Sequence, residues 1–354
     1  NHFLLIDEPT NHLDMQGRDI VAQYLAGKRG FLLVSHDRTF LDRSVDHIMA
    51  LQKNSVLVEQ GNYSTYRRNK QMRDDHERGQ NERLQKDIRR LTESGREKAQ
   101  WSDRVEATKI GQGPCDRGAI GHKAAKMMKR SLAIRQRIDR RIEEKESLLK
   151  ELERADPIHL QPLAHPARVL LTANDLGFAY PDGPPLIRSL SLVIARGQRL
   201  AITGGNGTGK STLLKLLAGQ LMPMAGSLSG PQDLVISTLP QETGSLRGTP
   251  RALAGRWGLE TDHFFTLLRK FDFPREAFER DAGGFSLGQQ KKLLLAASMA
   301  RPAHLYLWDE PLNYIDLESR EQIEDMLVDT QATMVFVEHD RHFVERVATD
   351  TLAL

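Results

Sequence analysis

A glycine-rich loop in the second half of the chain carries the clearest chemistry. Residues 204–212 read Gly-Gly-Asn-Gly-Thr-Gly-Lys-Ser-Thr, after the apolar run 199–203 and before the apolar run 213–217. This order of strand, loop and helix predicts a phosphate-binding loop, because glycines let backbone N–H groups turn toward phosphate oxygens. Lys210 would neutralise the β- and γ-phosphates, and Ser211 would bind Mg²⁺. A chance glycine-rich turn is the alternative, which the flanking strand and helix disfavour.

A pair of acidic residues follows the apolar run 305–308. Asp309, at the end of this predicted strand, is expected to hold Mg²⁺ through water. Glu310 is then placed to polarise an attacking water as general base. A solvated turn is the usual interpretation of a lone Asp-Glu pair. The phosphate loop upstream and a second copy of the pair both argue against it here.

A third motif precedes the predicted helix 290–300. It consists of Ser286, Leu287, Gly288 and Gln289. Free N–H groups and the helix dipole make such a helix start an anion site. Taken alone, an ordinary N-cap is an equally good interpretation. Its position shortly before the Asp-Glu pair favours anion binding.

An internal repeat organises the chain. Residues 6–14 recur as 308–316, and residues 31–38 recur as 334–341. The two offsets, 302 and 303, differ by one residue, which indicates duplicated domains. Only six residues precede the first acidic pair, so the chain is expected to begin inside its first domain.

The middle of the chain predicts two antiparallel helices, roughly 68–107 and 122–155, because apolar residues recur there at helix spacing. Five glycines and prolines break that pattern in the loop at about 108–121. From residue 169 onward, short apolar runs alternate with helical segments, as in an α/β domain. We therefore expect three parts: residues 1–67, a helical linker over 68–166, and an α/β domain over 167–354.

Charge is concentrated in the linker. Residues 67–156 hold 25 Lys and Arg against 17 Asp and Glu, whereas the whole chain has a net charge of only +3. This asymmetry suggests a polyanionic partner, although a charge run is more often a solvated face. Cys115 is the single cysteine, and no apolar run approaches the roughly 18 residues of a membrane span. These features favour a reducing cytosol.

The order of these motifs resembles that of ABC ATPase cassettes over residues 169–354. The resemblance implies that Tyr180 stacks on adenine, that Gln241 contacts Mg²⁺ and the attacking water, and that His339 touches the γ-phosphate. Ser286, Gly288 and Gln289 would bind the ATP held by the other cassette. The remaining implied nucleotide-binding residues are Gly204, Asn206, Gly207, Gly209, Lys210, Ser211 and Thr212.

Residues 1–66 similarly resemble the rear of another cassette, which gives Asp7 as a metal ligand and Glu8 and His36 as catalytic residues. Because ABC sites form between two cassettes, neither composite site would be whole in this chain. Leu287 departs from the family, where many cassettes have glycine.

The chain resembles ABC-F translational ATPases in its two cassettes, its lack of a membrane segment, residues 9–14 (Pro-Thr-Asn-His-Leu-Asp) and the hairpin between cassettes. Within that family, it is most similar to the Lsa and Vga-type antibiotic-resistance branch over residues 116–130 and 304–313. The resemblance implies a monomer that hydrolyses ATP in the cytoplasm, without a membrane partner. It would bind the ribosome, with its hairpin near the P-site tRNA, and displace lincosamide, streptogramin A or pleuromutilin drugs. The expected contacts with rRNA are Lys123, Lys126, Lys129 and Arg130. A housekeeping ABC-F translation or assembly factor is the main alternative, and a transporter ATPase subunit is a weaker one.

Overall fold

The computed structural model describes residues 3–11, 13–28, 30–51, 55–107, 158–181, 183–244 and 246–354, with a few residues between 133 and 145. Side chains within 94–107 are not described. The chain divides into two compact units, residues 1–64 together with 155–354, and residues 65–154.

The unit of residues 65–154 contains most of helix α3 (Tyr63–Ala107), which begins five residues before the predicted start. The described residues between 133 and 145 are helical, and Lys145 Nζ donates to Asp87 Oδ2 at 2.7 Å. The rest of the predicted second helix and the whole loop lie outside the described residues. Across the described residues, each helix is too short or too polar to cross a membrane.

A five-stranded parallel sheet forms the centre of the other unit, in the order β12-β7-β11-β10-β9. The strands are β7 (Arg199–Thr203), β9 (Ile236–Leu239), β10 (Leu305–Asp309), β11 (Met334–Val337) and β12 (Asp350–Ala353). All residues of β10 and β11 are buried, as their uninterrupted apolar sequences predict.

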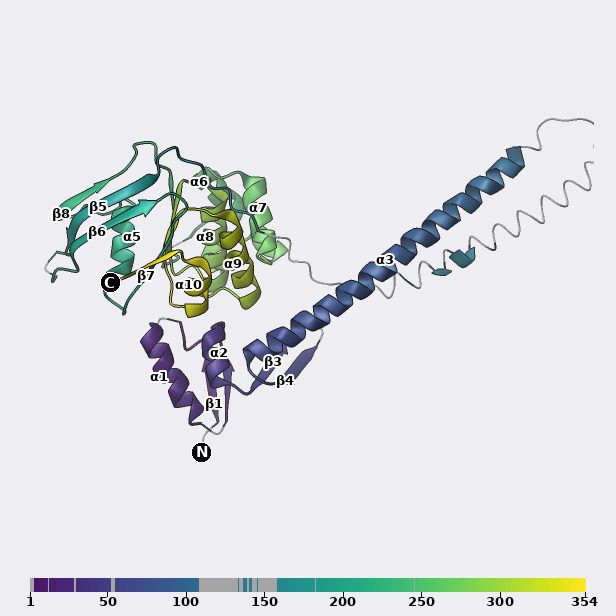
Figure 1. The fold of residues 1–354 in the computed structure, drawn as a ribbon, viewed down its shortest axis with the longest axis horizontal. Helices are drawn as coiled ribbons and strands as arrows, with labels where there is room; N and C mark the ends of the chain where they lie inside the picture. The colour runs from purple at the N-terminus through teal and green to yellow at the C-terminus, as the bar shows by residue number, and fades with distance from the viewer. Residues whose placement is uncertain are drawn as a thin grey trace, which may run out of the picture. The chain divides into compact units, whose positions relative to one another are not determined.

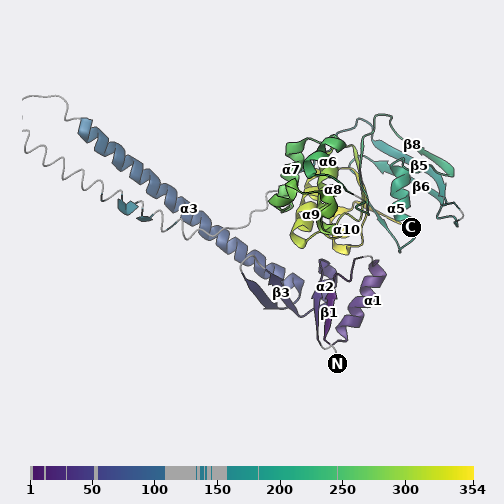
Figure 2. The same ribbon diagram turned by 180° about the vertical axis from the view of Figure 1, so that it is seen from behind.

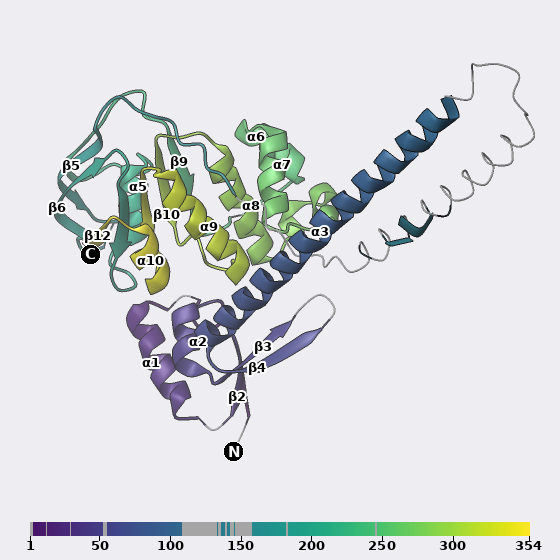
Figure 3. The same cartoon turned by 45° about the vertical axis from the view of Figure 1, so that its right-hand side comes forward.

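The two faces of this sheet pack against different layers. Alternate residues such as Trp308 and Phe336 face one core, and their neighbours Leu307 and Val335 face the other. The first core includes helices α6 (Pro250–Trp257), α7 (Thr261–Lys270), α8 (Leu287–Ala300), α9 (Leu317–Thr330) and α10 (Arg341–Val347). Figures 1 and 3 show α8 and α9 on this side of the sheet, away from α5 (Lys210–Leu217).

The second core lies between α5, the central sheet and an antiparallel sheet of order β6-β5-β8. Its strands are β5 (Val169–Phe178), β6 (Ile187–Ala195) and β8 (Ala225–Ser229), and Figure 2 shows them at the far side of the cassette from α6 and α7. Two short 3₁₀ turns, Arg275–Glu279 and Ala282–Gly284, precede α8. The predicted α/β cassette with a phosphate loop is confirmed.

The first copy of the repeat forms the same local elements. Strands β1 (Leu4–Asp7) and β2 (Phe31–Val34) pair in parallel, as β10 and β11 do, and helices α1 (Met15–Ala26) and α2 (Arg38–Ser44) follow them. Strands β3 (His47–Leu51) and β4 (Val56–Gln60) then form a hairpin before α3. Helices α1 and α2 each start at an aspartate N-cap, as do α9 and α10.

Candidate functional site

The phosphate loop connects β7 to α5 and depends on its glycines. Gly204, Gly207 and Gly209 have φ values of 145°, 79° and 101°, a region that side chains with a Cβ disfavour. A Cβ on Gly204 would also lie 2.6 Å from the carbonyl oxygen of Leu354. The loop therefore requires glycine for its conformation and for the close approach of Leu354.

Lys210, the first residue of α5, lies along this loop. Its Nζ donates to the carbonyl oxygens of Gly204 (3.1 Å) and Gly205 (2.6 Å). Burial lowers the pKa of Lys210, and the carboxylates of Glu310, Asp14 and Asp309 oppose that shift. The lysine thus places a positive charge at the loop, and these three carboxylates surround it.

Asp309 ends β10 next to the start of α5. Its side chain is buried and hydrogen-bonds to Ser211, as the sequence-based pairing of these residues anticipates. Burial raises the pKa of Asp309, while Ser211 and nearby lysines lower it. Its Oδ1 is buried without a hydrogen-bond partner among the described residues. An orphaned carboxylate oxygen beside a serine hydroxyl is what a bound hard cation would satisfy.

Glu310 is held in a rare backbone conformation. Its φ is 47°, its N–H donates to Val337 O at 2.9 Å, and the Asn313 side chain donates to Oε2. Burial raises the pKa of Glu310, the charges of Glu338 and Asp309 raise it further, and a hydrogen bond from Gln241 lowers it. A buried carboxylate with a raised pKa suits a general base.

His339 faces that carboxylate, with Nε2 3.7 Å from Glu310 Oε1. Burial and then the positive charge of Lys210 lower the pKa of His339 to about 4. The ring is therefore neutral near pH 7 and can offer a hydrogen bond without adding a charge.

Lys291 lies beside the candidate site, and the sequence motifs did not reveal it. It is buried on α8, and its Nζ donates to the carbonyl oxygens of Pro240 (3.0 Å), Gln241 (3.4 Å) and Asp309 (3.2 Å). Burial lowers its pKa to about 8. Lys291 thus ties the segment of Gln241 to the end of β10. A lysine on the apolar face of a predicted helix was the available signal.

The segment predicted as an anion site begins α8. Ser286 is its N-cap, and Gln289 completes a capping box, with N–H···O distances of 3.1 and 3.3 Å. A Cβ on Gly288 would lie 2.9 Å from Tyr314 O, so this glycine allows the segment to approach the residues after Glu310. The N-cap interpretation therefore holds, and it leaves Ser286 exposed at a helix N-terminus.

Tyr180 lies beside the phosphate-loop helix. Its hydroxyl is 3.2 Å from Thr212 Oγ1, its ring packs edge-on against Phe178, and 45% of the residue is exposed. A partly exposed aromatic ring next to a phosphate loop can stack on a nucleobase.

The first copy reproduces the second around Glu8. Its φ is 43°, its N–H donates to Val34 O at 2.9 Å, and His36 Nε2 lies 3.3 Å from Oε1. Burial raises the pKa of Glu8 and lowers that of His36. Asp7 precedes Glu8 at the end of β1, as Asp309 precedes Glu310.

Contacts between the two copies are also reciprocal. Arg18 donates to the carbonyl oxygen of His339 at 3.2 Å, and Arg320, its counterpart in the repeat, donates to that of His36 at 2.7 Å. Asp14 accepts a hydrogen bond from the phosphate-loop N–H of Asn206 at 3.3 Å. Neither arginine belongs to a motif identified in the sequence, although each stands four residues after the aspartate that ends a repeat segment.

Magnesium fits this site only as part of a complex with a ligand. The described residues contain no cluster of three or more His, Cys, Asp or Glu side chains that could hold a metal. Ser211, Asp309 and Gln241 supply one hydroxyl, one carboxylate and one amide oxygen. Mg²⁺ commonly completes such a partial set with phosphate oxygens and water.

Comparison with known proteins shows what this cassette is similar to. Residues 187–313 match the family described as ABC transporter, a range that holds the phosphate loop and the Asp309-Glu310 pair. The fold of residues 158–354 and this match agree, and both are similar to ABC-type ATPase cassettes. The solved structure of RNase-L Inhibitor has the same fold, with a TM-score of 0.58 and 20% identity over 99% of this chain and 57% of that one.

Curated relatives lie in the ABC-F group. YdiF, an ATP-binding protein of Bacillus subtilis, is 32% identical over 99% of this chain and 52% of its own length. The ribosome protection protein VmlR of the same organism is 29% identical over 99% and 64%. The energy-dependent translational throttle protein EttA of Mycobacterium tuberculosis is 27% identical over 99% and 59%. The chain thus spans about half to two thirds of these relatives.

Proposed function

We propose that the full-length product of this gene hydrolyses ATP between two ABC cassettes of one chain and uses that cycle to act on the ribosome. The observation that carries the ATPase part is the hydrogen bond from the phosphate-loop N–H of Asn206 to Asp14. It supports a paired arrangement, because a residue of one copy reaches the phosphate loop of the other.

The triphosphate would lie on residues 204–212, with Lys210 neutralising its charge and the adenine on Tyr180. Ser211, Asp309 and Gln241 would hold Mg²⁺, which when bound neutralises the phosphate oxygens. Ser286 and Gly288 would serve the nucleotide of the other cassette. Asp7 would be the corresponding metal ligand of the first copy.

Glu310 would accept a proton from the attacking water, and its raised pKa improves it as a base. His339, neutral near pH 7, would donate a hydrogen bond to the terminal phosphate. Glu8 and His36 would perform the same roles in the first copy. Their matching backbone conformation and His-to-Glu contact support this assignment.

The ribosomal part of the proposal rests on two observations: the excess positive charge of residues 67–156, and the similarity to VmlR and EttA, whose names describe ribosome protection and translational control. Lys123, Lys126, Lys129 and Arg130 would contact RNA phosphates. All four lie outside the described residues, so they stay a prediction from sequence.

Ribosome binding tests this part directly. The full-length product would be sedimented with purified ribosomes at several salt concentrations, with ATP and with a non-hydrolysable analogue. Replacing Lys126, Lys129 and Arg130 by alanine should lower the salt dependence of binding by about two to three phosphate contacts. An unchanged slope would remove these residues from the RNA interface. Association with membranes and not with ribosomes would favour a transporter subunit.

Protection against antibiotics is the narrower form of the proposal, supported by the likeness to VmlR. Expression in a susceptible bacterium should raise the inhibitory concentrations of a lincosamide and a pleuromutilin. A Glu8→Gln, Glu310→Gln variant is the matched control. Ribosome binding without any rise would favour a housekeeping translation factor.

A further inference from the structure

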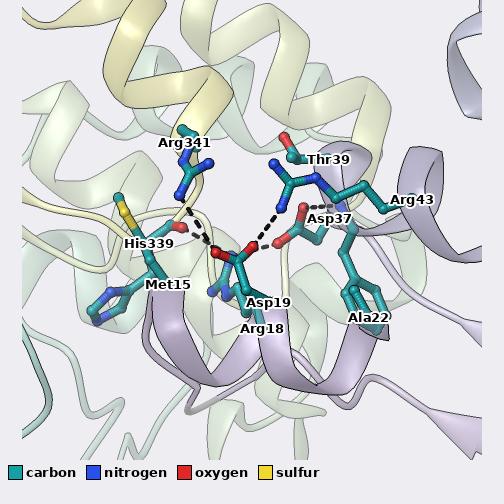
Figure 4. A pocket seen from close by; sticks show the side chains of 10 residues that line it. Met15, Arg18, Asp19, Ala22, Asp37, Thr39, Arg43, His339 and Arg341 are labelled. Carbon is teal, nitrogen blue, oxygen red and sulfur yellow. Dashed lines mark hydrogen bonds and ion pairs between the residues drawn. The ribbon is translucent and has the colours of Figure 1, made fainter. Parts of the chain in front are cut away.

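A small pocket, open to solvent, lies where α1 and α2 of the first copy meet the start of α10 (Figure 4). Its lining brings together side chains from both copies of the repeat. The residues around it are Met15, Arg18, Asp19, Ala22, Asp37, Thr39, Phe40, Arg43, His339 and Arg341.

The repeat explains why this cavity exists. Shifting α1 by 302 residues places Ala22 on Glu324, and shifting α2 by 303 places Thr39 on His342. Glu324 and His342 are the larger members of each pair. The equivalent place in the other copy is therefore filled by side chains, whereas two small residues leave space here.

In the second copy, the carboxylate of Glu324 occupies the place equivalent to this pocket. This carboxylate is completely buried, and both its oxygens contact Arg38, at 2.9 and 3.1 Å. Arg346 donates to it at 2.9 Å, and His342 Nδ1 lies 3.7 Å away. Two arginines, one from each copy, thus converge on one carboxylate.

The cavity keeps the arginines but lacks that carboxylate. Arg341 and Arg43 are the repeat counterparts of Arg38 and Arg346, and both line the cavity. Asp19 contacts both of them, at 3.7 Å from Arg341, and it corresponds to Glu321, not to Glu324.

The lining therefore has an excess of positive charge. It holds three arginines and two aspartates. Asp37 is paired with Arg18 at 2.6 Å, so Asp19 is the one remaining aspartate of the lining for Arg43 and Arg341. The three arginines at the equivalent place of the repeat are Arg38, Arg320 and Arg346. They face three carboxylates, those of Glu321, Glu324 and Asp340. Guanidinium groups around an open space favour planar or tetrahedral oxyanions, which they bind with two parallel N–H groups.

We propose that this cavity binds a small oxyanion, which occupies the place of the Glu324 carboxylate and joins Arg43 of the first copy to Arg341 of the second. Inorganic phosphate and a small carboxylate share the required chemistry. His339 of the lining also belongs to the proposed ATP site, but Arg43 and Arg341, which would hold the anion, have no role in the proposed reaction.

The test measures thermal unfolding of the full-length product as phosphate or acetate is titrated, with chloride keeping the ionic strength constant. Lys210→Ala is used as the background, so that phosphate binding at the glycine loop does not contribute. In this background, the preferred anion should raise the melting temperature by about 2–6 °C at ten times its Kd. A response to phosphate alone or to acetate alone identifies which source of oxyanion the cavity accepts.

Ala22→Glu supplies the missing carboxylate from the chain itself. It should abolish the response to the anion and give the protein a higher melting temperature in chloride alone. Arg43→Gln is the second variant, on a half-exposed residue that tolerates exchange, and it should reduce the response. Equal responses in the background and in both variants would overturn the proposal, and so would equal effects of chloride and the oxyanions.

Discussion

Around Glu8 and around Glu310 the chain repeats one backbone conformation in two different settings. Both residues have φ near 45°, and a histidine ring lies near each carboxylate. Glu310 follows a strand that is buried throughout and lies between two neighbouring strands, whereas Leu5 in β1 is 76% exposed. The local geometry thus follows the local sequence, and the burial follows the elements packed around it.

The settings also differ in charge. The pKa of Glu310 is raised by burial and then by the charges of Glu338 and Asp309. The pKa of Glu8 is raised by burial, with Arg320 as the next cause, which lowers it, and with smaller raising contributions from Asp7 and Asp37. Glu338 stands where the first copy has Ser35. Duplicated motifs therefore need not contribute equally, and this difference can be tested.

The largest expected effect is on hydrolysis. Glu310→Gln removes the proposed base, and phosphate release by the full-length product should fall about 10²- to 10⁴-fold. Glu8→Gln should slow the other site, and the double variant should accumulate in its ATP-bound form on ribosomes. Rapid turnover in the double variant would remove both residues from the role of base.

The buried carboxylate Glu324 should matter far more for stability than Asp19, which is 43% exposed. Glu324→Ala leaves Arg38 buried without its main partner and should cost about 3–5 kcal/mol of unfolding free energy. Asp19→Ala should cost about 1 kcal/mol or less. Urea denaturation in chloride buffer measures both, and similar losses would contradict the asymmetry between the two halves of the interface.

Lys291 should affect turnover through the residues it positions. Lys291→Met removes donors to the carbonyl oxygens of Gln241 and Asp309, and hydrolysis should fall about 10- to 100-fold. Lys292→Met is the control from the same helix, because Lys292 instead contacts Phe271 O and Asp316. A larger loss in the control would show that the Lys291 contacts are not important for the site.

The last expected effect concerns pH. The pKa of His339 is about 4 in the folded chain, below its usual value of 6.5, so the unfolded chain binds the proton more tightly. Stability should therefore fall as the pH drops from 6.5 toward 4, by up to about 1.4 kcal/mol per pH unit. The His339→Gln variant should lose less stability over this range than the original protein. Identical pH profiles would mean that the histidine does not carry the effect.

Much of the cassette was predictable because its signals are local. Glycine at positions with positive φ, a β-strand before the loop and aspartates at helix starts each depend on a few neighbouring residues. The predicted strands 199–203 and 305–308 are present, and the helix expected at 290–300 begins at Leu287.

Other features could not be predicted because they depend on distant partners. Helix spacing can place Lys291 on the apolar face of its helix, but only the fold brings its Nζ to three carbonyl oxygens. Arg18 and Arg320 each contact the backbone of a histidine that lies more than 280 positions away. A local sequence pattern does not show which residues far apart in the sequence come into contact.

The sequence by itself determined the cassette, the repeat and the residues able to handle a phosphate, because each follows from residue type and short spacing. Only the tertiary structure decided which carboxylates are buried and which arginines converge. It therefore showed that Ala22 leaves a cationic cavity where Glu324 fills its counterpart. The physical reason is that desolvation and charge pairing depend on the neighbours folding supplies, and those neighbours come from the other end of the chain.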